Sequence, residues 1–306
     1  MSGRPFKPSK PSSKLSKPSF SWFFAQITER IYRWALPPLA LFVNRAFPGL
    51  KRRFKRASYD WFSSALGQLG VDGIHLLNYG YAYADGLALP LDLDAKDRQE
   101  YLFSWNLVYE TARPARVAGK KVLVIGCGRG GDAYFIRRYL NAASVVGIDL
   151  SRAGIDACRR DYSMPGLEFG VGDAERLQFP DEAFDAVISI ESSHGYGDLG
   201  VFYRQVSRVL KPGGIFLYCD YFRDQSFRRQ LSAASLKVLE EADITEGVLR
   251  ACRDGQAARE TRILRHAPSA LHGMLREWCA FPGSTMYRAL EQRACRYHRF
   301  VLMKGV

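Results

Sequence analysis

The feature that most constrains this chain is an apolar run, residues 122–125, that leads directly into a glycine-rich turn. Four strand-forming side chains predict a buried β-strand. The glycines that follow, Gly126, Gly128 and Gly131, predict a tight turn whose backbone N–H groups can approach a ligand. A second short apolar run ends on Asp149, whose carboxylate can accept hydrogen bonds from the two hydroxyls of a ribose. The pattern predicts a nucleotide-cofactor site, but the glycine spacing also fits dinucleotide-binding folds and leaves the nucleotide open.

Further segments extend this pattern into an alternating α/β chain. An amphipathic segment at residues 201–210 predicts a helix between two strand-like runs, and a Lys-Pro-Gly-Gly turn follows it. Strands that alternate with helices are typical of a doubly wound sheet, in which ligands bind beyond the carboxyl ends of the strands. The additional expected strands are residues 167–171, 184–189, 215–219, 236–239 and 297–304.

Taken in order, these motifs resemble those of the class I S-adenosylmethionine-dependent methyltransferases. The resemblance implies a Rossmann-like, seven-stranded sheet with an antiparallel last strand, and S-adenosyl-L-methionine as the cofactor. It covers about residues 75–304 and is strongest between residues 122 and 219. The shared elements are the Gly-Cys-Gly-x-Gly turn at 126–130, the acidic end of the second strand, Gly172-Asp173-Ala174, the Phe184-Asp185 strand and the Leu-Lys-Pro-Gly-Gly turn at 210–214.

The resemblance also implies which residues hold the cofactor. The glycine turn would face the methionine portion, Asp149 the ribose and Asp173 the adenine amine, while the end of the fourth strand would close the near side. One departure is Val124, where many relatives have an acidic residue, so backbone carbonyls or another acid must recognise the methionine amino group. The expected cofactor-binding residues are Gly126, Cys127, Gly128, Gly130, Asp149, Leu150, Asp173, Ala174, Ile190 and Glu191.

The loop after the fourth strand, residues 191–196, carries the candidate chemistry. Methyl transfer from a sulfonium needs no metal in principle, but a hydroxyl acceptor must lose a proton. Histidine suits proton removal near neutral pH, which makes His194 the candidate base, with Asp220 after the fifth strand orienting its imidazole. The pair resembles the His and Asp of rebeccamycin-type sugar O-methyltransferases. The alternative is a hydrogen-bonded structural histidine, and Tyr196 is expected to bind the acceptor.

A lead-in segment before the glycine turn has a more specific pattern. Residues 77–82 resemble the Met-Asn-Tyr-Gly-Tyr lead-in of phthiotriolone-type lipid methyltransferases, and residues 243–249 resemble a second element of the same enzymes. The resemblance implies that Tyr79 and Tyr81 bind substrate and that the lead-in acts as a lid. A packed turn is the alternative. Helical periodicity downstream predicts a helical cap over the acceptor pocket, around residues 245–290.

The first 60 residues carry most of the net charge. They contain 13 basic and two acidic residues and therefore hold +11 of the chain's +13. Residues 1–19 are rich in Ser, Pro and Lys and predict a disordered basic tail. Residues 20–74 predict a basic amphipathic helical extension whose apolar run is interrupted by prolines and is shorter than the roughly 20 residues of a transmembrane helix.

Three interpretations of this extension remain open. Residues 20–60 could attach the protein to an anionic membrane surface, pack on the enzyme's own cleft, or bind nucleic acid, which is the least favoured because no nucleic-acid module is present. Six cysteines without metal-ligand spacing predict reduced thiols, no metal site and a cytoplasmic protein, with peripheral membrane attachment if the first interpretation holds. The sequence does not indicate an oligomeric state.

The combined hypothesis is an enzyme that methylates a hydroxyl on a hydrophobic lipid- or polyketide-like molecule. Residues 75–306 would form the methyltransferase domain. One alternative is carbon methylation of a prenylated quinone, tocopherol or sterol, because those enzymes share the loop architecture. Another, from a different class, is a non-catalytic membrane or assembly factor that retains cofactor binding.

Overall fold

The computed structural model describes residues 76, 78–86, 89–264, 269 and 272–305. The tail expected at residues 1–19 and the extension expected at residues 20–74 lie outside the described residues, so the structure does not test either prediction. The described residues form the lead-in and the α/β domain that follows it in the sequence.

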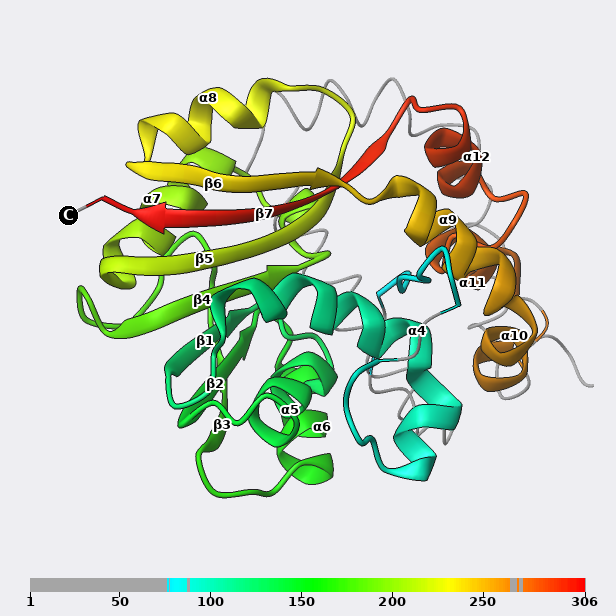
Figure 1. The fold of residues 1–306 in the computed structure, drawn as a ribbon, viewed down its shortest axis with the longest axis horizontal. Helices are drawn as coiled ribbons and strands as arrows, with labels where there is room; N and C mark the ends of the chain where they lie inside the picture. Colours follow the sequence, from blue (N-terminus) through cyan, green and yellow to red (C-terminus); the bar gives the residue numbers. More distant parts are fainter. Residues whose placement is uncertain (1–75, 77, 87–88, 265–268, 270–271, 306) are drawn as a thin grey trace, which may run out of the picture.

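Seven strands form one mixed sheet in the order β3-β2-β1-β4-β5-β7-β6 (Figure 1). Neighbouring strands are parallel except at β7, which runs antiparallel to both β5 and β6. This order confirms the Rossmann-like sheet and the antiparallel last strand expected from the sequence. The strands are β1 (Lys121–Ile125), β2 (Ser144–Asp149), β3 (Leu167–Val171), β4 (Phe184–Ile190), β5 (Leu210–Phe222), β6 (Leu236–Asp243) and β7 (Arg296–Lys304).

After the exposed Lys121, the central strand β1 is apolar because helices cover both faces of the sheet. Val122, Leu123 and Val124 are fully buried. Successive side chains of a strand point to opposite faces, and accordingly Val122 and Val124 join one core cluster while Leu123 and Ile125 join the other. The acidic position that many relatives have at Val124 would place a charge in this core.

Five helices make up the two outer layers of the described domain. Residues of α4 (Ala95–Ala112), α5 (Gly131–Arg138) and α6 (Arg152–Asp161) pack in the core on one face. Residues of α7 (Leu199–Val209) and α8 (Ser226–Ala233) pack on the other. The helix α7 confirms the amphipathic segment predicted at residues 201–210, within two residues at its start.

Strand β5 begins five residues earlier than the expected start at residue 215. Leu210 pairs with Phe184 of β4, and the register between the two strands shifts before the pairing resumes at Ile215. The Lys-Pro-Gly-Gly turn is therefore an irregular stretch inside the strand, where Gly213 takes the left-handed φ of +72°. Only the pairing with β4 distinguishes this arrangement from a turn.

Four more helices lie beyond the carboxyl ends of the parallel strands, where the lead-in also lies (Figure 1). They are packed on one another in sequence, and the lead-in is hydrogen-bonded to the first of them through Ala82 N–H and the Gly247 carbonyl, 3.0 Å apart. This edge of the sheet is where a doubly wound fold binds its ligands. The helices are α9 (Thr245–Asp254), α10 (Gln256–Leu264), α11 (His272–Trp278) and α12 (Thr285–Glu291).

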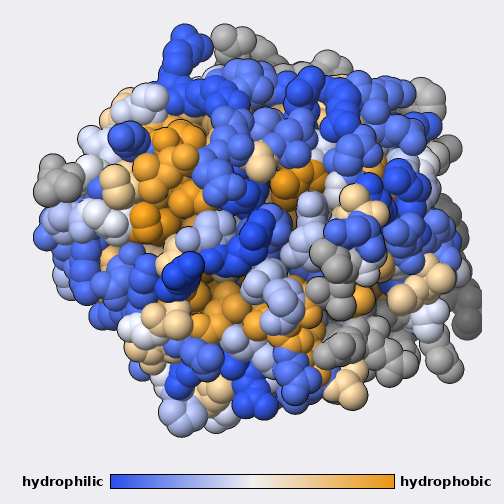
Figure 2. Space-filling model, viewed as in Figure 1, coloured by the Kyte–Doolittle hydropathy of each residue, from blue (hydrophilic) through white to orange (hydrophobic). Residues whose placement is uncertain are grey.

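The surface is mostly polar on the face viewed in Figure 1, and its apolar area is divided among separate patches (Figure 2). Among the described residues, the large apolar side chains with more than a third of their surface exposed are Val171 on β3 and Val238 and Leu239 on β6, which are the two edge strands. None of the described helices combines the length and the apolar composition needed to cross a membrane.

Candidate active site

The glycine turn is held in place by the neighbouring strand. The N–H groups of Gly126 and Cys127 both donate to the Ile148 carbonyl of β2, at 2.8 and 3.0 Å. Gly126 and Gly128 have φ of +73° and +54°, which side-chain-bearing residues rarely adopt. A Cβ at Gly128 would meet no atom within 4 Å, so the turn leaves open space at that position.

Asp149 lies beside this open space at the end of β2. One carboxylate oxygen accepts from Gly128 N–H at 2.9 Å, and the other accepts from Ser151 N–H at 2.8 Å. Carboxylate oxygens are hydrogen-bond acceptors and suit the hydroxyl groups of a nucleoside. The open glycine and the adjoining carboxylate fit the cofactor that the sequence implies.

The other expected cofactor-binding residues line the same edge of the sheet. Leu150 follows Asp149 directly and is half-buried, while Ile190 is buried at the end of β4. Asp173 accepts a hydrogen bond from Glu175 N–H at 3.0 Å in the turn after β3, and Ala174 is buried beside it. The fold therefore brings the predicted set together at the carboxyl ends of β1, β2, β3 and β4.

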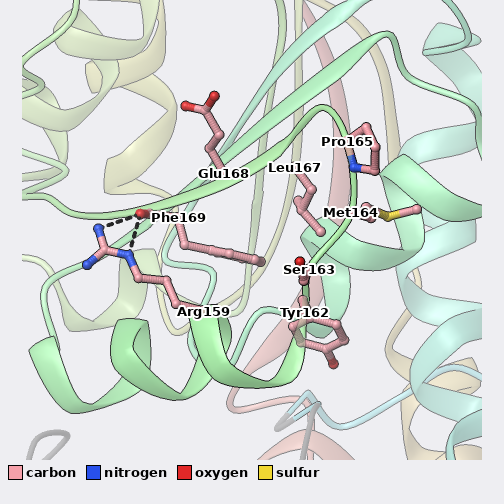
Figure 3. A pocket seen from close by; sticks show the side chains of 8 residues that line it. All are labelled: Arg159, Tyr162, Ser163, Met164, Pro165, Leu167, Glu168 and Phe169. Atoms are coloured by element: carbon pink, nitrogen blue, oxygen red, sulfur yellow. Dashed lines mark hydrogen bonds between the residues drawn. The ribbon is translucent and has the colours of Figure 1, made fainter.

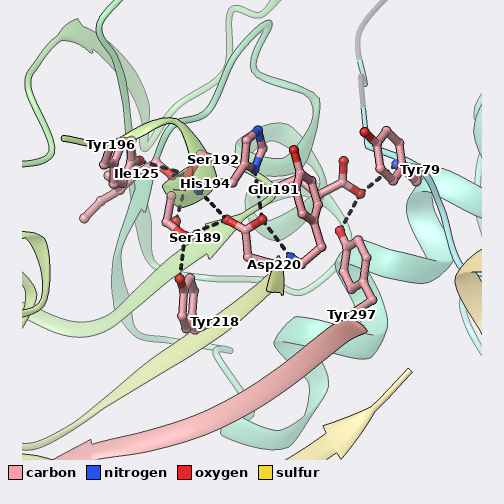
Figure 4. A network of polar contacts seen from close by, with 12 residues as sticks. Tyr79, Ile125, Ser189, Glu191, Ser192, His194, Tyr196, Tyr218, Asp220 and Tyr297 are labelled. Atoms are coloured by element: carbon pink, nitrogen blue, oxygen red, sulfur yellow. Dashed lines mark hydrogen bonds and ion pairs between the residues drawn. The ribbon is translucent and has the colours of Figure 1, made fainter. Parts of the chain in front are cut away.

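His194 and Asp220 meet at the carboxyl ends of β4 and β5 (Figure 4). The imidazole Nδ1 lies 2.9 Å from one carboxylate oxygen of Asp220, and the second oxygen accepts from Ser193 Oγ at 2.6 Å and from His194 N–H at 3.1 Å. Burial opposes ionisation of Asp220, but His194 and these donors outweigh it and hold its pKa below the usual value. The pairing assigns the Nδ1 proton to His194 and leaves Nε2 as the basic nitrogen.

An aromatic stack connects His194 with the lead-in. The imidazole lies on the Tyr221 ring at a centroid distance of 4.4 Å, with an angle of 21° between the planes. Tyr221 in turn stacks on Tyr79 at 6.1 Å and 8°. The structure therefore brings Tyr79, one of the two expected substrate-binding tyrosines, into the set around His194.

Glu191 also lies in this set, between the lead-in and β7 (Figure 4). One carboxyl oxygen accepts from Tyr79 N–H at 2.7 Å and from the Tyr297 hydroxyl. Glu191 has a left-handed φ of +46°, which is uncommon for a residue with a side chain. Burial raises its pKa to about 8, against the effect of the two donors, and the nearby Asp220 adds to the increase.

Tyr196 lies against the glycine turn, next to a cluster of serine hydroxyls (Figure 4). Its hydroxyl is 2.9 Å from Ser192 Oγ, which also contacts Ser189 Oγ at 2.9 Å. A Cβ at Gly126 would be 2.4 Å from Cβ of Ser192, so only glycine allows the two loops to approach this closely. The structure thus places Tyr196 on the cofactor side of the loop.

Like Tyr196, Tyr81 is an expected substrate-binding residue that the structure does not place against His194. Its ring lies against α9, where a Cβ at Gly247 would be 2.0 Å from the Tyr81 ring. It also makes an edge contact with Tyr83 at 5.0 Å. The absence of a side chain at Gly247 makes room for the Tyr81 ring.

Sequence reasoning missed three residues of this region. Tyr221 and Tyr297 are direct partners in the β5–β7 pairing, so an antiparallel β7 next to β5 could have placed Tyr297 beside the end of β5. No sequence signal singled out Arg259, whose buried guanidinium donates to the Tyr79 carbonyl at 2.6 Å.

A separate surface depression of about 530 Å³ lies between α6 and β3 (Figure 3). The Arg159 guanidinium on its wall donates to the Phe169 carbonyl at 3.1 and 2.7 Å. The depression holds none of the residues expected to act in catalysis or to bind the cofactor. It is lined by Arg159, Tyr162, Ser163, Met164, Pro165, Leu167, Glu168 and Phe169.

Known proteins are similar to this chain in sequence and in fold. A family model described as a methyltransferase domain matches residues 123–218. The phthiotriol/phenolphthiotriol dimycocerosates methyltransferase of Mycobacterium tuberculosis (strain ATCC 25618 / H37Rv) is 34% identical over 259 residues, which are 84% of this chain and 95% of that protein. The fatty-acid O-methyltransferase of Mycolicibacterium smegmatis is 37% identical over 244 residues, 78% of this chain and 87% of that protein.

A solved structure shares the fold at lower sequence identity. It is the geranyl diphosphate C-methyltransferase of Streptomyces coelicolor A3(2), in complex with Mg²⁺, geranyl diphosphate and S-adenosyl-L-homocysteine. It superposes with a TM-score of 0.54 and 19% identity, and the match covers 74% of this chain and 90% of that chain.

Proposed function

Because the chain belongs to the S-adenosylmethionine-dependent methyltransferases, we propose that it methylates a hydroxyl group of a lipid-like acceptor. The observation that carries the proposal is the His194–Asp220 pair at the carboxyl edge of the sheet, because removal of a hydroxyl proton needs a base there. When bound, S-adenosyl-L-methionine supplies an electrophilic methyl group on a sulfonium. The acceptor class follows from the printed functions of the relatives, which act on dimycocerosates and on fatty acids.

The glycine turn and Asp149 would hold the cofactor. Gly128 leaves room for the ligand to approach the backbone, and Asp149 offers carboxylate oxygens to the ribose. Asp173 and Ala174 would border the adenine, and Ile190 would close the near side. Tyr196 and the Ser192 hydroxyl, which are hydrogen-bonded to each other, would hold the loop after β4 against the glycine turn.

His194 would take the proton of the acceptor hydroxyl on Nε2. Asp220 holds the imidazole in the required tautomer through Nδ1 and stabilises the imidazolium that forms. Ser193 and the backbone fix the Asp220 carboxylate in turn. The stacked Tyr221 and Tyr79 limit the rotation of the ring and provide an apolar wall for the acceptor.

The charges around His194 favour an uncharged acceptor. Asp220 is ionised and buried, whereas Glu191, whose pKa is raised to about 8, is protonated at neutral pH and adds no charge. The buried guanidinium of Arg259 is engaged with two backbone carbonyls. A carboxylate acceptor would meet like charge here, whereas an alcohol or phenol would not. The proposal therefore selects a hydroxyl over a carboxyl group.

The experiment is a pair of methyl-transfer assays with S-adenosyl-L-methionine labelled in its methyl group. The acceptors are a long-chain secondary alcohol and palmitic acid, with product identified by mass spectrometry and NMR. We expect label in an ether of the alcohol and little in the fatty-acid ester. Preferred transfer to palmitic acid would reject the hydroxyl proposal.

We also propose that residues 20–60 attach the enzyme to an anionic membrane surface. The proposal depends on the excess of basic over acidic residues in this part of the sequence. Each basic residue near such a surface contributes about 1 kcal/mol to binding. A membrane-bound enzyme would meet a lipid acceptor without extracting it through water.

A further inference from the structure

The backbone of Tyr79 is held from two sides by residues far away in the sequence. Its N–H donates to Glu191 on the loop after β4 at 2.7 Å. Its carbonyl accepts from Arg259 of α10 at 2.6 Å, and the Cys252 thiol also approaches it at 3.9 Å. The lead-in is thus tied at one residue to both the catalytic loop and the helices beyond the sheet.

Arg259 also reaches a third element. Its other terminal nitrogen donates to the Cys279 carbonyl, directly after α11, at 2.8 Å. The residue is only 7% exposed, and none of the described acidic residues lies within ion-pair distance of it. A buried cation that is satisfied by two carbonyls instead of a carboxylate is costly to maintain, which argues for a positional requirement.

The position of Tyr79 determines what surrounds the imidazole. Tyr79 stacks on Tyr221, and Tyr221 stacks on His194, so a displacement of the lead-in would remove the outer ring of this stack. Hydrogen bonds from a charged donor are about twice as strong as neutral ones. Arg259 is therefore the strongest single tie between α10 and the aromatic stack.

We infer that Arg259 is a positioning residue for methyl transfer, which fixes the lead-in at Tyr79 and thereby keeps the Tyr79–Tyr221–His194 stack closed over the acceptor. The effect of Arg259 on methyl transfer rests on the proposed function. Its role in fixing the backbone of Tyr79 does not. Arg259 donates its hydrogen bonds to the Tyr79 and Cys279 carbonyls and not to His194 or the glycine turn, although its charge lies close enough to lower the pKa of Glu191.

The chain offers a matched control for this role. Arg250 of α9 also donates to a lead-in carbonyl, that of Ala82, at 3.0 Å. It makes the same kind of tie three residues further along the lead-in. Arg259→Met and Arg250→Met therefore each remove one guanidinium bond to a lead-in carbonyl, but only Arg259→Met removes the bond that holds Tyr79, together with the bond to Cys279.

The first measurement is hydrogen exchange of the full-length protein with single-amide resolution. We expect Arg259→Met to accelerate exchange of the Tyr79 amide at least about ten-fold, which corresponds to the loss of one charge-assisted bond. Arg250→Met should leave that amide unchanged, and calorimetry should give both variants the wild-type affinity for S-adenosyl-L-homocysteine. Unchanged exchange in Arg259→Met, or equal acceleration in both variants, would overturn the inference.

The second measurement is kinetics with the long-chain secondary alcohol. We expect Arg259→Met to lower kcat about ten-fold or more at saturating cofactor, with partial recovery in Arg259→Lys, which can still reach one carbonyl. Normal kcat despite faster exchange would reduce Arg259 to a structural tie and refute the positioning role. If Arg259→Met does not fold, Arg259→Lys carries the same two measurements. Wild-type enzyme that does not methylate the alcohol at all refutes the proposed function alone.

Discussion

At the scale of single residues, the site holds two buried carboxyl groups whose surroundings shift their pKa values in opposite directions. Asp220 faces His194, Ser193 and two backbone N–H groups, and its pKa lies below the usual value although burial opposes this. Glu191 lies among tyrosines, and burial raises its pKa to about 8. Neighbouring titratable groups with pKa values shifted in opposite directions are typical of active sites. At one pH, such a pair provides one charged group and one neutral group.

Replacement of His194 tests the assignment of the base. Among the described partners of Asp220, His194 is the one that can accept a proton near neutral pH, so we expect His194→Ala to lower kcat on the alcohol by roughly 10²- to 10⁴-fold. Binding of S-adenosyl-L-homocysteine, measured by calorimetry, should not change. His272→Ala, which changes a histidine at the start of α11, is the control and should keep wild-type turnover. Near-normal turnover in His194→Ala would remove the general-base role.

The raised pKa of Glu191 predicts how the stability of the folded protein depends on pH. Its folded-state pKa of about 8 exceeds the ordinary 4.5, so the folded protein binds a proton that the unfolded chain releases within this window. Stability therefore falls as pH rises from about 4.5 to about 8. In Glu191→Gln, whose amide stays neutral and whose oxygen can still accept from Tyr79, this part of the decrease should disappear.

The measurement is urea unfolding of wild type and Glu191→Gln at pH of about 6 and about 9. A smaller loss of stability in the variant is expected. Some pH dependence should remain, because burial also raises the pKa of Asp132 to about 7, and Asp149 nearby adds to this. Identical pH dependence in the two proteins would contradict the assignment of a neutral Glu191.

At the scale of elements, the glycine turn uses two of its glycines for different reasons. Gly126 is needed because Ser192 of the next loop leaves no space for a side chain. Gly128 has space but a left-handed φ of +54°, and the space is where the cofactor would approach the backbone. The fold therefore requires glycine at position 126, and we expect the bound cofactor to add a requirement at position 128.

Comparison of Gly128→Ala with Gly119→Ala separates a clash with the cofactor from the strain of a left-handed backbone. Gly119, before β1, shares the positive φ, at +71°, and the absence of neighbours within 4 Å of a new Cβ. Both alanine variants should lose about 1 kcal/mol of stability through the left-handed backbone. Only Gly128→Ala should also lose affinity for S-adenosyl-L-homocysteine, at least about ten-fold by calorimetry. Equal affinity in the two variants would show that the cofactor does not occupy this space.

At the scale of the whole molecule, charge is separated along the chain. Residues 1–60 carry +11 of the net +13, and residues 61–306 are nearly neutral. The described domain has mostly polar surface on the face of Figure 2, and its exposed large apolar side chains lie on the edge strands β3 and β6. Binding to an anionic surface would therefore depend on the N-terminal residues.

Liposome flotation tests this dependence. The full chain should float with vesicles containing phosphatidylglycerol and less with neutral phosphatidylcholine vesicles, and salt at about 0.5 M should weaken binding by screening. A chain lacking residues 1–60 should stay in the bottom fraction, while binding S-adenosyl-L-homocysteine normally. Recovery that does not depend on these residues would exclude them as the membrane contact.

Local signals account for most of what could be predicted before the structure. The strands β1 and β2, the glycine turn and Asp149 follow from apolar runs and turn residues within about 30 positions of one another. The antiparallel β7 followed from resemblance, since periodicity alone does not indicate a partner. The early start of β5 could not be predicted, because Leu210 belongs to the strand only through its pairing with Phe184.

By itself, the sequence determined the succession of strands and helices along the chain and the cofactor turn, and it predicted that His194 approaches Asp220, because loops that end neighbouring parallel strands meet at one edge of a sheet. Tertiary structure alone decided that Tyr79 joins the stack over His194 while Tyr81 turns to Gly247, and that Arg259 holds the lead-in. These contacts connect residues separated by more than a hundred positions, and no local periodicity or turn chemistry encodes such distances.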